Sequence, residues 1–130
     1  MKHIYRFIVV VFTIAGLLFG WYLCEQNNAV ETFDLADYQE IVTRHPCDMV
    51  VGEIRDQETA KHEADKVFVE VLGIDLSEYK TYWISFDADC EVWHIAASKV
   101  NPAEGLVAFG GCPEVLIKSN GEVLSVWHSK

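Results

Sequence analysis

The sequence lacks the short motifs that identify several classes of enzyme and metal protein. No C-x-x-C pair occurs among its four cysteines, which argues against a thioredoxin-type redox centre and a zinc ribbon. No G-x-S-x-G marks a serine nucleophile. Gly110 and Gly111 lead into an expected strand and not into a helix, so they do not form a phosphate-binding loop. We therefore expect no catalytic residue, cofactor or metal ion.

Basic residues are scarce. The 130 residues contain 10 lysines and arginines against 20 aspartates and glutamates, for a net charge of −10. Lys2 and Arg6 precede a hydrophobic run, and without them 8 basic residues face 20 acidic ones, which leaves −12. Such a surface repels nucleic acid and attracts basic partners. Solubility alone is the alternative explanation.

The hydrophobic run "FIVVVFTIAGLLFGWYL" extends from Phe7 to Leu23. Its length is at the short end of what spans a bilayer, and no convincing small-residue cleavage site follows it. For residues 1–28 an uncleaved membrane anchor is therefore favoured over a cleaved signal sequence. Because the basic residues precede the run, they stay in the cytoplasm, and the remaining chain is expected on the periplasmic side of a bacterial inner membrane.

The cysteines leave the disulfide pattern open. Cys24 belongs to the hydrophobic segment, so Cys47, Cys90 and Cys112 remain, an odd number in a compartment that permits disulfides. One pair and one free thiol are possible, and the sequence does not select the pair.

Helical patterns occupy the first half of the remaining chain. Residues 29–50 are expected to form a linker with a short helix over residues 33–44. A longer helix is predicted after Asp56, a good N-cap residue, and Gly73 supplies its left-handed end. The residues predicted to form the apolar face of this helix are Ala60, Ala64, Val67, Phe68, Val71 and Leu72.

Four strands are predicted in the second half, over residues 80–86, 90–97, 113–119 and 122–128. Asn120 and Gly121 between the last two are typical of a hairpin turn. Gly110 and Gly111 are expected to bend the sheet. The sequence therefore predicts an α+β domain over residues 51–130, in which helices pack on a curved four-stranded antiparallel sheet and one sheet face receives the apolar stripe of the long helix.

Several residues on the strands are candidates for a pocket or for the core. Trp83, Trp93 and Trp127 are expected on three strands and would line one concavity, although core or interface positions are more common for tryptophan. His94 and His128 are expected on neighbouring strands, where an acid–base pair is conceivable and two partly exposed side chains are the preferred interpretation.

The alternating carboxylates of Asp87, Asp89 and Glu91 resemble the start of a calcium loop, but they lack its glycine and its distal glutamate. A solvated hairpin turn is therefore favoured over a metal site.

The order of several features resembles the bacterial immunity proteins with a nuclear transport factor 2 fold that accompany polymorphic toxins. The resemblance covers residues 51–130. It begins with G-x-I-x-D-x-x-T-A, which is formed by Gly52, Ile54, Asp56, Thr59 and Ala60. The later features are Gly73, the x-V-W-x-I strand with Val92, Trp93 and Ile95, the pair Gly110 and Gly111, and the Asn-Gly hairpin before "VLSVWHSK".

This resemblance implies a cystatin-like, cone-shaped domain that binds and neutralises a cognate toxin. Toxin-contact residues do not follow from it. Acidic residues are expected to meet basic toxin groups, and the candidates are Glu53, Glu58, Asp87, Asp89 and Glu91. An isomerase-like enzyme or a small-molecule binding protein of the same pocketed fold is the alternative, and an enzyme would need an ionisable pair in an apolar pocket, with His94 or an aspartate as the base.

Overall fold

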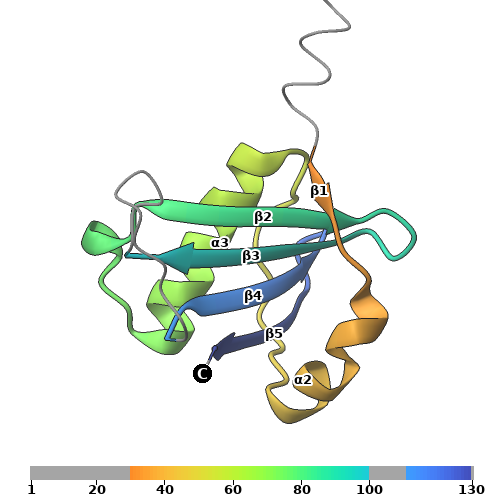
Figure 1. Ribbon diagram of the computed structural model, residues 1–130, viewed down its shortest axis with the longest axis horizontal. Coiled ribbons are helices and arrows are strands. Elements are labelled where there is room, and N and C mark those ends of the chain that lie inside the picture. Colours follow the sequence, from red (N-terminus) through yellow and green to blue (C-terminus); the bar gives the residue numbers. More distant parts are fainter. Residues whose placement is uncertain (1–29, 100–110, 130) are drawn as a thin grey trace, which may run out of the picture.

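A five-stranded mixed sheet in the order β1-β2-β3-β4-β5 forms the centre of the computed structural model, which describes residues 30–99 and 111–129 (Figure 1). The strands are β1 (Glu31–Thr32), β2 (Thr81–Asp87), β3 (Val92–Ser98), β4 (Pro113–Lys118) and β5 (Val123–His128). Strands β2 to β5 are antiparallel neighbours, whereas β1 runs parallel to β2. The predicted α+β class is confirmed, and each predicted strand lies within two residues of an observed one. The expected hydrophobic helix and Gly110 lie outside the described residues.

Two α-helices accompany the sheet in the described part of the chain. They are α2 (Gln39–Arg44), which follows the 3-10 segment η1 (Leu35–Tyr38), and α3 (Gln57–Leu72), which precedes the 3-10 segment η2 (Leu76–Glu78). The predicted short helix is therefore present, but only its second half is α-helical: Phe33 and Asp34 are irregular, and residues 35–38 form a 3-10 turn.

The ends of α3 are those that the sequence predicts. The Asp56 side chain accepts a hydrogen bond from the Thr59 backbone N–H at 2.8 Å, and the Thr59 hydroxyl accepts one from the Asp56 N–H at 3.1 Å. These reciprocal bonds satisfy donors that the first helical turn leaves open. Gly73 ends the helix with a φ of 64°. The predicted apolar face is wrong at Val71, whose side chain lies in the last turn and is 46% exposed.

The face of the sheet under α3 carries the larger core. Ala60, Ala64, Val67 and Phe68 of the helix are buried there against Ile95, Val115 and Ile117 of the central strands, and Ile54 joins them from the segment before the helix. This is the packing that the apolar stripe of the helix predicts.

The opposite face is covered as well, although the sequence pattern predicts no cover for it. Val92, Leu116 and Trp127 form a second buried cluster on that face. Side chains of the N-terminal segment pack on it, namely Phe33, Leu35, Tyr38, Ile41 and Val42. One face receives the stripe of the long helix as predicted, but the cover on the second face was not part of the prediction. Strands β3 to β5 carry apolar residues on both faces, as strands covered on two sides do.

The segment between the two helices covers the outer edge of β5. Val50 and Glu122 form an antiparallel bridge, as do Pro46 and Ser125. The Val123 N–H also donates to the Met49 carbonyl at 2.9 Å. The residues expected to be a linker therefore protect one sheet edge in addition to one sheet face.

The β4–β5 hairpin is present where Asn120 and Gly121 predict it, but its turn is longer than the expected two residues. The Gly121 N–H donates to the Lys118 carbonyl at 2.9 Å, and the Lys118 N–H donates to the Glu122 carbonyl at 2.8 Å. Ser119, Asn120 and Gly121 therefore form a three-residue loop, in which Gly121 alone has a positive φ, 95°. The Asn120 side chain accepts from the Glu122 N–H at 3.0 Å.

Candidate functional site

Four of the five predicted acidic residues are exposed at one end of the sheet. The backbone of Ser119 joins three segments there, because its N–H donates to the Glu91 carbonyl and its carbonyl accepts from the Ile54 N–H, both at 2.9 Å. The β2–β3 turn, the β4–β5 turn and the chain entering α3 consequently meet at this end (Figure 1). We term the exposed carboxylates of Glu53, Glu58, Asp89 and Glu91 the acidic end.

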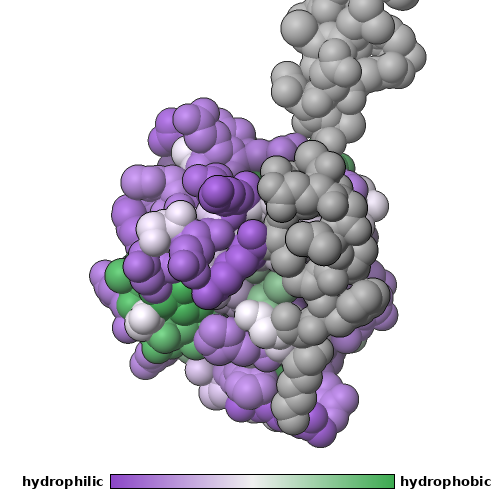
Figure 2. All heavy atoms as spheres, turned by 60° about the vertical axis from the view of Figure 1, so that its left-hand side comes forward, coloured by the Kyte–Doolittle hydropathy of each residue, from purple (hydrophilic) through white to green (hydrophobic). Residues whose placement is uncertain are grey.

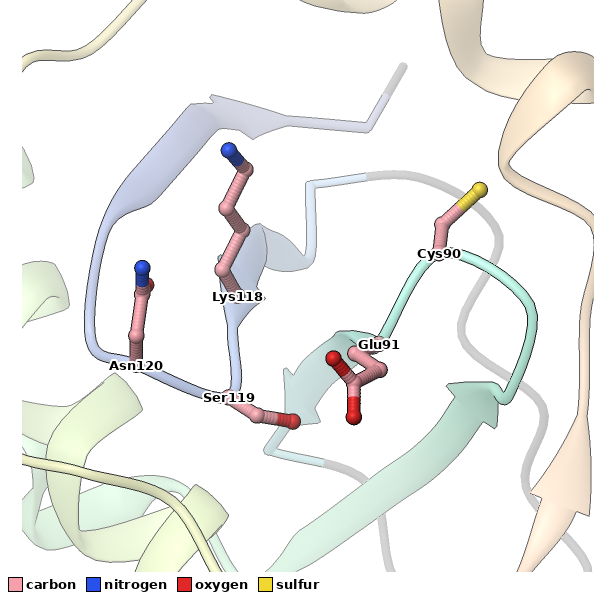
Figure 3. A pocket seen from close by; sticks show the side chains of 5 residues that line it. All are labelled: Cys90, Glu91, Lys118, Ser119 and Asn120. Atoms are coloured by element: carbon pink, nitrogen blue, oxygen red, sulfur yellow. The ribbon is translucent and has the colours of Figure 1, made fainter.

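Two hollows open at the acidic end. One of about 240 Å³ is lined by Cys90, Glu91, Lys118, Ser119 and Asn120 (Figure 3). A second of about 490 Å³ is lined by Val30, Arg55, Asp56, Gln57, Glu58 and Trp93.

The two basic side chains in these hollows already have acidic partners. Lys118 Nζ lies 3.2 Å from Glu122 Oε2, and an Arg55 guanidinium nitrogen lies 3.2 Å from Glu53 Oε2. The other three carboxylates of the acidic end, those of Glu58, Asp89 and Glu91, face solvent, where they present negative charge to a partner.

Asp87 is not part of the acidic end, contrary to the sequence-based expectation, because its side chain is buried. Its carboxylate accepts the Leu35 N–H at 2.8 Å through one oxygen. The other oxygen accepts the Asp89 and Cys90 N–H groups at 3.0 and 3.1 Å. Asp87 therefore shapes the β2–β3 turn and ties the N-terminal segment to it. These hydrogen bonds, above all the one from Leu35, lower the pKa of its carboxyl group.

Replacing Asp87 by alanine should lower the free energy of unfolding at neutral pH, because three backbone donors lose their acceptor. The folded-state pKa is lowered, so the charged carboxylate stabilises the fold above its unfolded-state pKa. The deficit of the variant should thus begin to shrink below about pH 4 and be lost as the pH falls through the folded-state pKa. Denaturant unfolding at a series of pH values measures this, with Asp89→Ala as the exposed control. A deficit that persists unchanged into acid would contradict the role assigned to Asp87.

His94 and His128 do not lie together. Strand β4 separates β3 from β5, so the two histidines are not on neighbouring strands. His94 stacks on Trp127, with parallel rings 6.1 Å apart, and His128 follows Trp127 and therefore points to the other face of the sheet. The expectation that they lie on neighbouring strands is wrong, and the conceivable acid–base pair is not formed; the preferred interpretation of two at least partly exposed side chains agrees with a partly exposed His94 and an exposed His128.

His94 has a different ionisable partner, Glu114, which was not among the residues predicted from the sequence. Its Nε2 atom lies 2.8 Å from Glu114 Oε1, and the two side chains are 13% and 16% exposed. Phe33 and Tyr38 cover the imidazole at ring distances of 5.6 and 5.0 Å. Only the register of β3 against β4 could have indicated this contact, because Glu114 lies opposite Ala96, which is two residues from His94.

The surroundings of His94 favour a packed polar contact over a catalytic centre. Burial, followed by the charges of Glu114 and Asp37, raises the pKa of Tyr38, so its hydroxyl stays neutral. The hollows described above do not include His94 or Glu114. The imidazole therefore fills the space between the sheet and the N-terminal segment.

The three strand tryptophans do not line one concavity. Trp93 is buried on the face under α3, where its ring is tilted by 37° against that of Phe86, with ring centroids 4.6 Å apart. Trp127 is buried on the opposite face, in the second cluster. Trp83 shares that face with Trp127, since Ala96 and Glu114 lie between them in one cross-strand row, and it is 46% exposed. The three side chains therefore form no common concavity; Trp93 and Trp127 take the core positions that were expected as the more common alternative, and of the three only Trp83 is exposed.

Other candidate features give no site within residues 30–99 and 111–129. Cys47, Cys90 and Cys112 form no disulfide with one another. This part of the chain holds no group of three or more metal-ligating side chains. None of its helices has the length and apolar character needed to cross a membrane; the expected anchor lies outside the described residues.

Comparisons with known proteins add no relative to these observations. No protein-family model, no curated protein and no solved structure matches this chain. The functional assignment therefore depends on the sequence and the described geometry.

Proposed function

We propose that this chain is an immunity protein that binds a cognate bacterial toxin through the acidic end and so neutralises it. The observation that carries the proposal is the gathering of Glu53, Glu58, Asp89 and Glu91, which come from separate parts of the sequence, on one exposed end. A chain with a net charge of −10 attracts basic proteins, and a cluster of exposed carboxylates directs that attraction to one surface.

The packing supports a binding function better than the enzymatic alternative. The close ionisable pair of His94 on β3 and Glu114 on β4 lies under Phe33 and Tyr38. A general base needs hydrogen-bond reach to a bound substrate, which this covering obstructs. The hollows at the acidic end suit side chains of another protein, because they are open and lined mainly by polar residues.

The likeness to immunity proteins with a nuclear transport factor 2 fold is part of this proposal. The order of one long helix followed by four antiparallel strands supports it. The N-terminal segment on the second face of the sheet is the main departure from a simple cone that encloses a pocket. Anchoring on the periplasmic side is likewise proposed, from the hydrophobic run and the basic residues before it.

Co-expression tests the function. A neighbouring gene that encodes a secreted toxin is expressed in a bacterial host, with and without the full-length protein. We expect the toxin-expressing host to grow only when the full-length protein is also present. A version of the toxin with its active site inactivated is the matched control for toxicity. Equal killing in the two cultures, with both proteins detected, would overturn the proposal.

A further inference from the structure

The β2–β3 turn has a backbone conformation that needs support from other segments. Glu91 has a φ of 54° and is the one residue other than glycine with a positive φ in the described part of the chain. This left-handed conformation costs about 1 kcal/mol or more, and a residue with a Cβ atom keeps it only where surrounding contacts fix it. The Ser119 N–H supplies one such contact, a hydrogen bond of 2.9 Å to the Glu91 carbonyl. The exposed carboxylates of Asp89 and Glu91 therefore depend on how firmly the turn is held.

The Asp87 carboxylate also supports the turn and connects it to a distant segment. Its Oδ1 atom accepts the Asp89 and Cys90 N–H groups at 3.0 and 3.1 Å. Its Oδ2 atom accepts the Leu35 N–H at 2.8 Å, across 52 positions of the sequence. A rotation of this carboxylate would alter both sets of hydrogen bonds, because its two oxygen atoms move together. The turn and Leu35 are therefore coupled through one side chain.

Leu35 lies in the N-terminal segment, residues 33–42, which packs on the second apolar face and passes beside the β2–β3 turn (Figure 1). No side chain of η1 or α2 is buried, whereas five side chains of α3 are. Segments with few buried contacts open locally at a lower free energy than the core does. We therefore expect the N-terminal segment to open before the core, and its opening removes the Leu35 N–H from Asp87.

We propose that the N-terminal segment regulates the acidic end through the hydrogen bond from Leu35 to Asp87. With the segment packed on the sheet, Asp87 is held in place and the turn presents Asp89 and Glu91 to the toxin. With the segment open, the Asp87 carboxylate is free to rotate and the turn loses its fixed conformation. The consequence for binding rests on the proposed function, whereas the coupling itself rests on the contacts of Asp87.

Regulation of this kind suits a partner that is recognised by charge. The face of the molecule in Figure 2 is mainly hydrophilic and offers a partner little apolar area. Coulomb attraction depends on the distance between the charged groups, and a turn that must be ordered during binding costs part of the binding free energy. Glu53 precedes α3 and Glu58 lies in its first turn, so neither carboxylate is carried by the β2–β3 turn. The N-terminal segment therefore modulates the attraction and does not abolish it.

Leu35→Pro breaks the hydrogen bond, because proline has no backbone N–H and its ring takes the place of the proton. Leu35 is the first residue of η1, a position that suits proline, and Asp34 before it is extended, at φ −111° and ψ 118°, as a residue before proline prefers. Leu35→Ala is the matched control, since it removes the same side-chain packing and keeps the N–H. The comparison of the two variants therefore isolates the contact with Asp87.

Hydrogen exchange of the two full-length variants in detergent tests the coupling without a toxin. The Asp89 and Cys90 amides should exchange about tenfold faster in Leu35→Pro than in Leu35→Ala, because the turn opens more often once Asp87 is released. Amides in the buried part of α3 should exchange equally in the two variants, which establishes that both are folded. Equal exchange at Asp89 and Cys90 in the two variants would overturn the proposal.

Binding of the toxin domain gives a second reading, on the wild type. Because coupling is reciprocal, a bound toxin should slow the exchange of the Leu35 amide, although Leu35 is not part of the acidic end. Leu35→Pro should bind the toxin about threefold to tenfold more weakly than Leu35→Ala does. A toxin that binds without slowing Leu35 exchange would overturn the regulation and leave the proposed function intact. A toxin that binds none of the three proteins would overturn the proposed function, and exchange at Asp89 and Cys90 would still decide the coupling.

Discussion

Replacing Gly121 by alanine should destabilise the protein by about 3 kcal/mol or more, the largest loss we expect from any single added methyl group. Gly121 has a φ of 95°, a region that residues with a Cβ atom rarely adopt. A Cβ atom at this position would lie 2.1 Å from the Val51 carbonyl oxygen. The clash involves backbone, which moves only if the contact between the hairpin and residues 51–52 opens. That contact includes the hydrogen bond from the Val51 N–H to the Gly121 carbonyl at 2.8 Å.

Gly73→Ala is the matched control for this prediction. Gly73 also has a positive φ, 64°, but an added Cβ atom would meet nothing within 4 Å. Its substitution should cost only about 1 kcal/mol, from backbone strain alone. Denaturant unfolding measures the loss of folding free energy in both variants, and the difference between the two losses is the cost of the clash with Val51 beyond backbone strain. Equal losses in the two proteins would show that the hairpin moves away from Val51 at little cost, and would contradict the tight contact.

Local signals predicted the elements of this fold well. Asp56 and Gly73 mark the ends of α3 because a capping side chain and a left-handed glycine act within a few residues of their own position. The Asn-Gly pair marks the β4–β5 hairpin for the same reason. The Asn-Gly pair did not predict the correct loop length, which is three residues and not two, because Asn120 has a negative φ and only Gly121 has a positive one.

Long-range pairing explains most of what the sequence did not reveal. The contact between His94 and Glu114 depends on the register of two strands that are joined by a long connection. The burial of Asp87 depends on Leu35, which is 52 residues away in the chain. An alternating carboxylate pattern gives the same sequence signal whether its first member is exposed or accepts three backbone bonds. Sequence periodicity also does not show which segment covers a second apolar face, which here is residues 33–42.

The acidic end combines both kinds of information. Acidic composition predicts a negative surface, whereas only the backbone bonds of Ser119 bring Glu53 and Glu91 to the same end. If this gathering matters for function, the position of the charges must matter in addition to their number. Net charge and local charge can be separated by moving the same substitutions to another part of the surface.

Changing Glu53, Glu58, Asp89 and Glu91 together to lysine should slow association with the cognate toxin domain by about a hundredfold at low ionic strength. Four exchanges of −1 for +1 change the net charge from −10 to −2. The matched control makes the same change at Asp37, Glu40, Asp48 and Glu70, which are exposed elsewhere. Because long-range steering acts mainly through the charges nearest the contact, the control should slow association much less.

Stopped-flow association rates at several salt concentrations distinguish local steering from net charge. The difference between the two variants should shrink as salt rises, because the screening length falls to about 8 Å at physiological ionic strength. Unfolding curves establish that both variants are folded. If the two variants slow association equally, net charge alone attracts the toxin. If neither variant slows it, the toxin binds elsewhere, and the exposed side chain of Trp83 becomes the next position to test, because it offers apolar packing in place of charge.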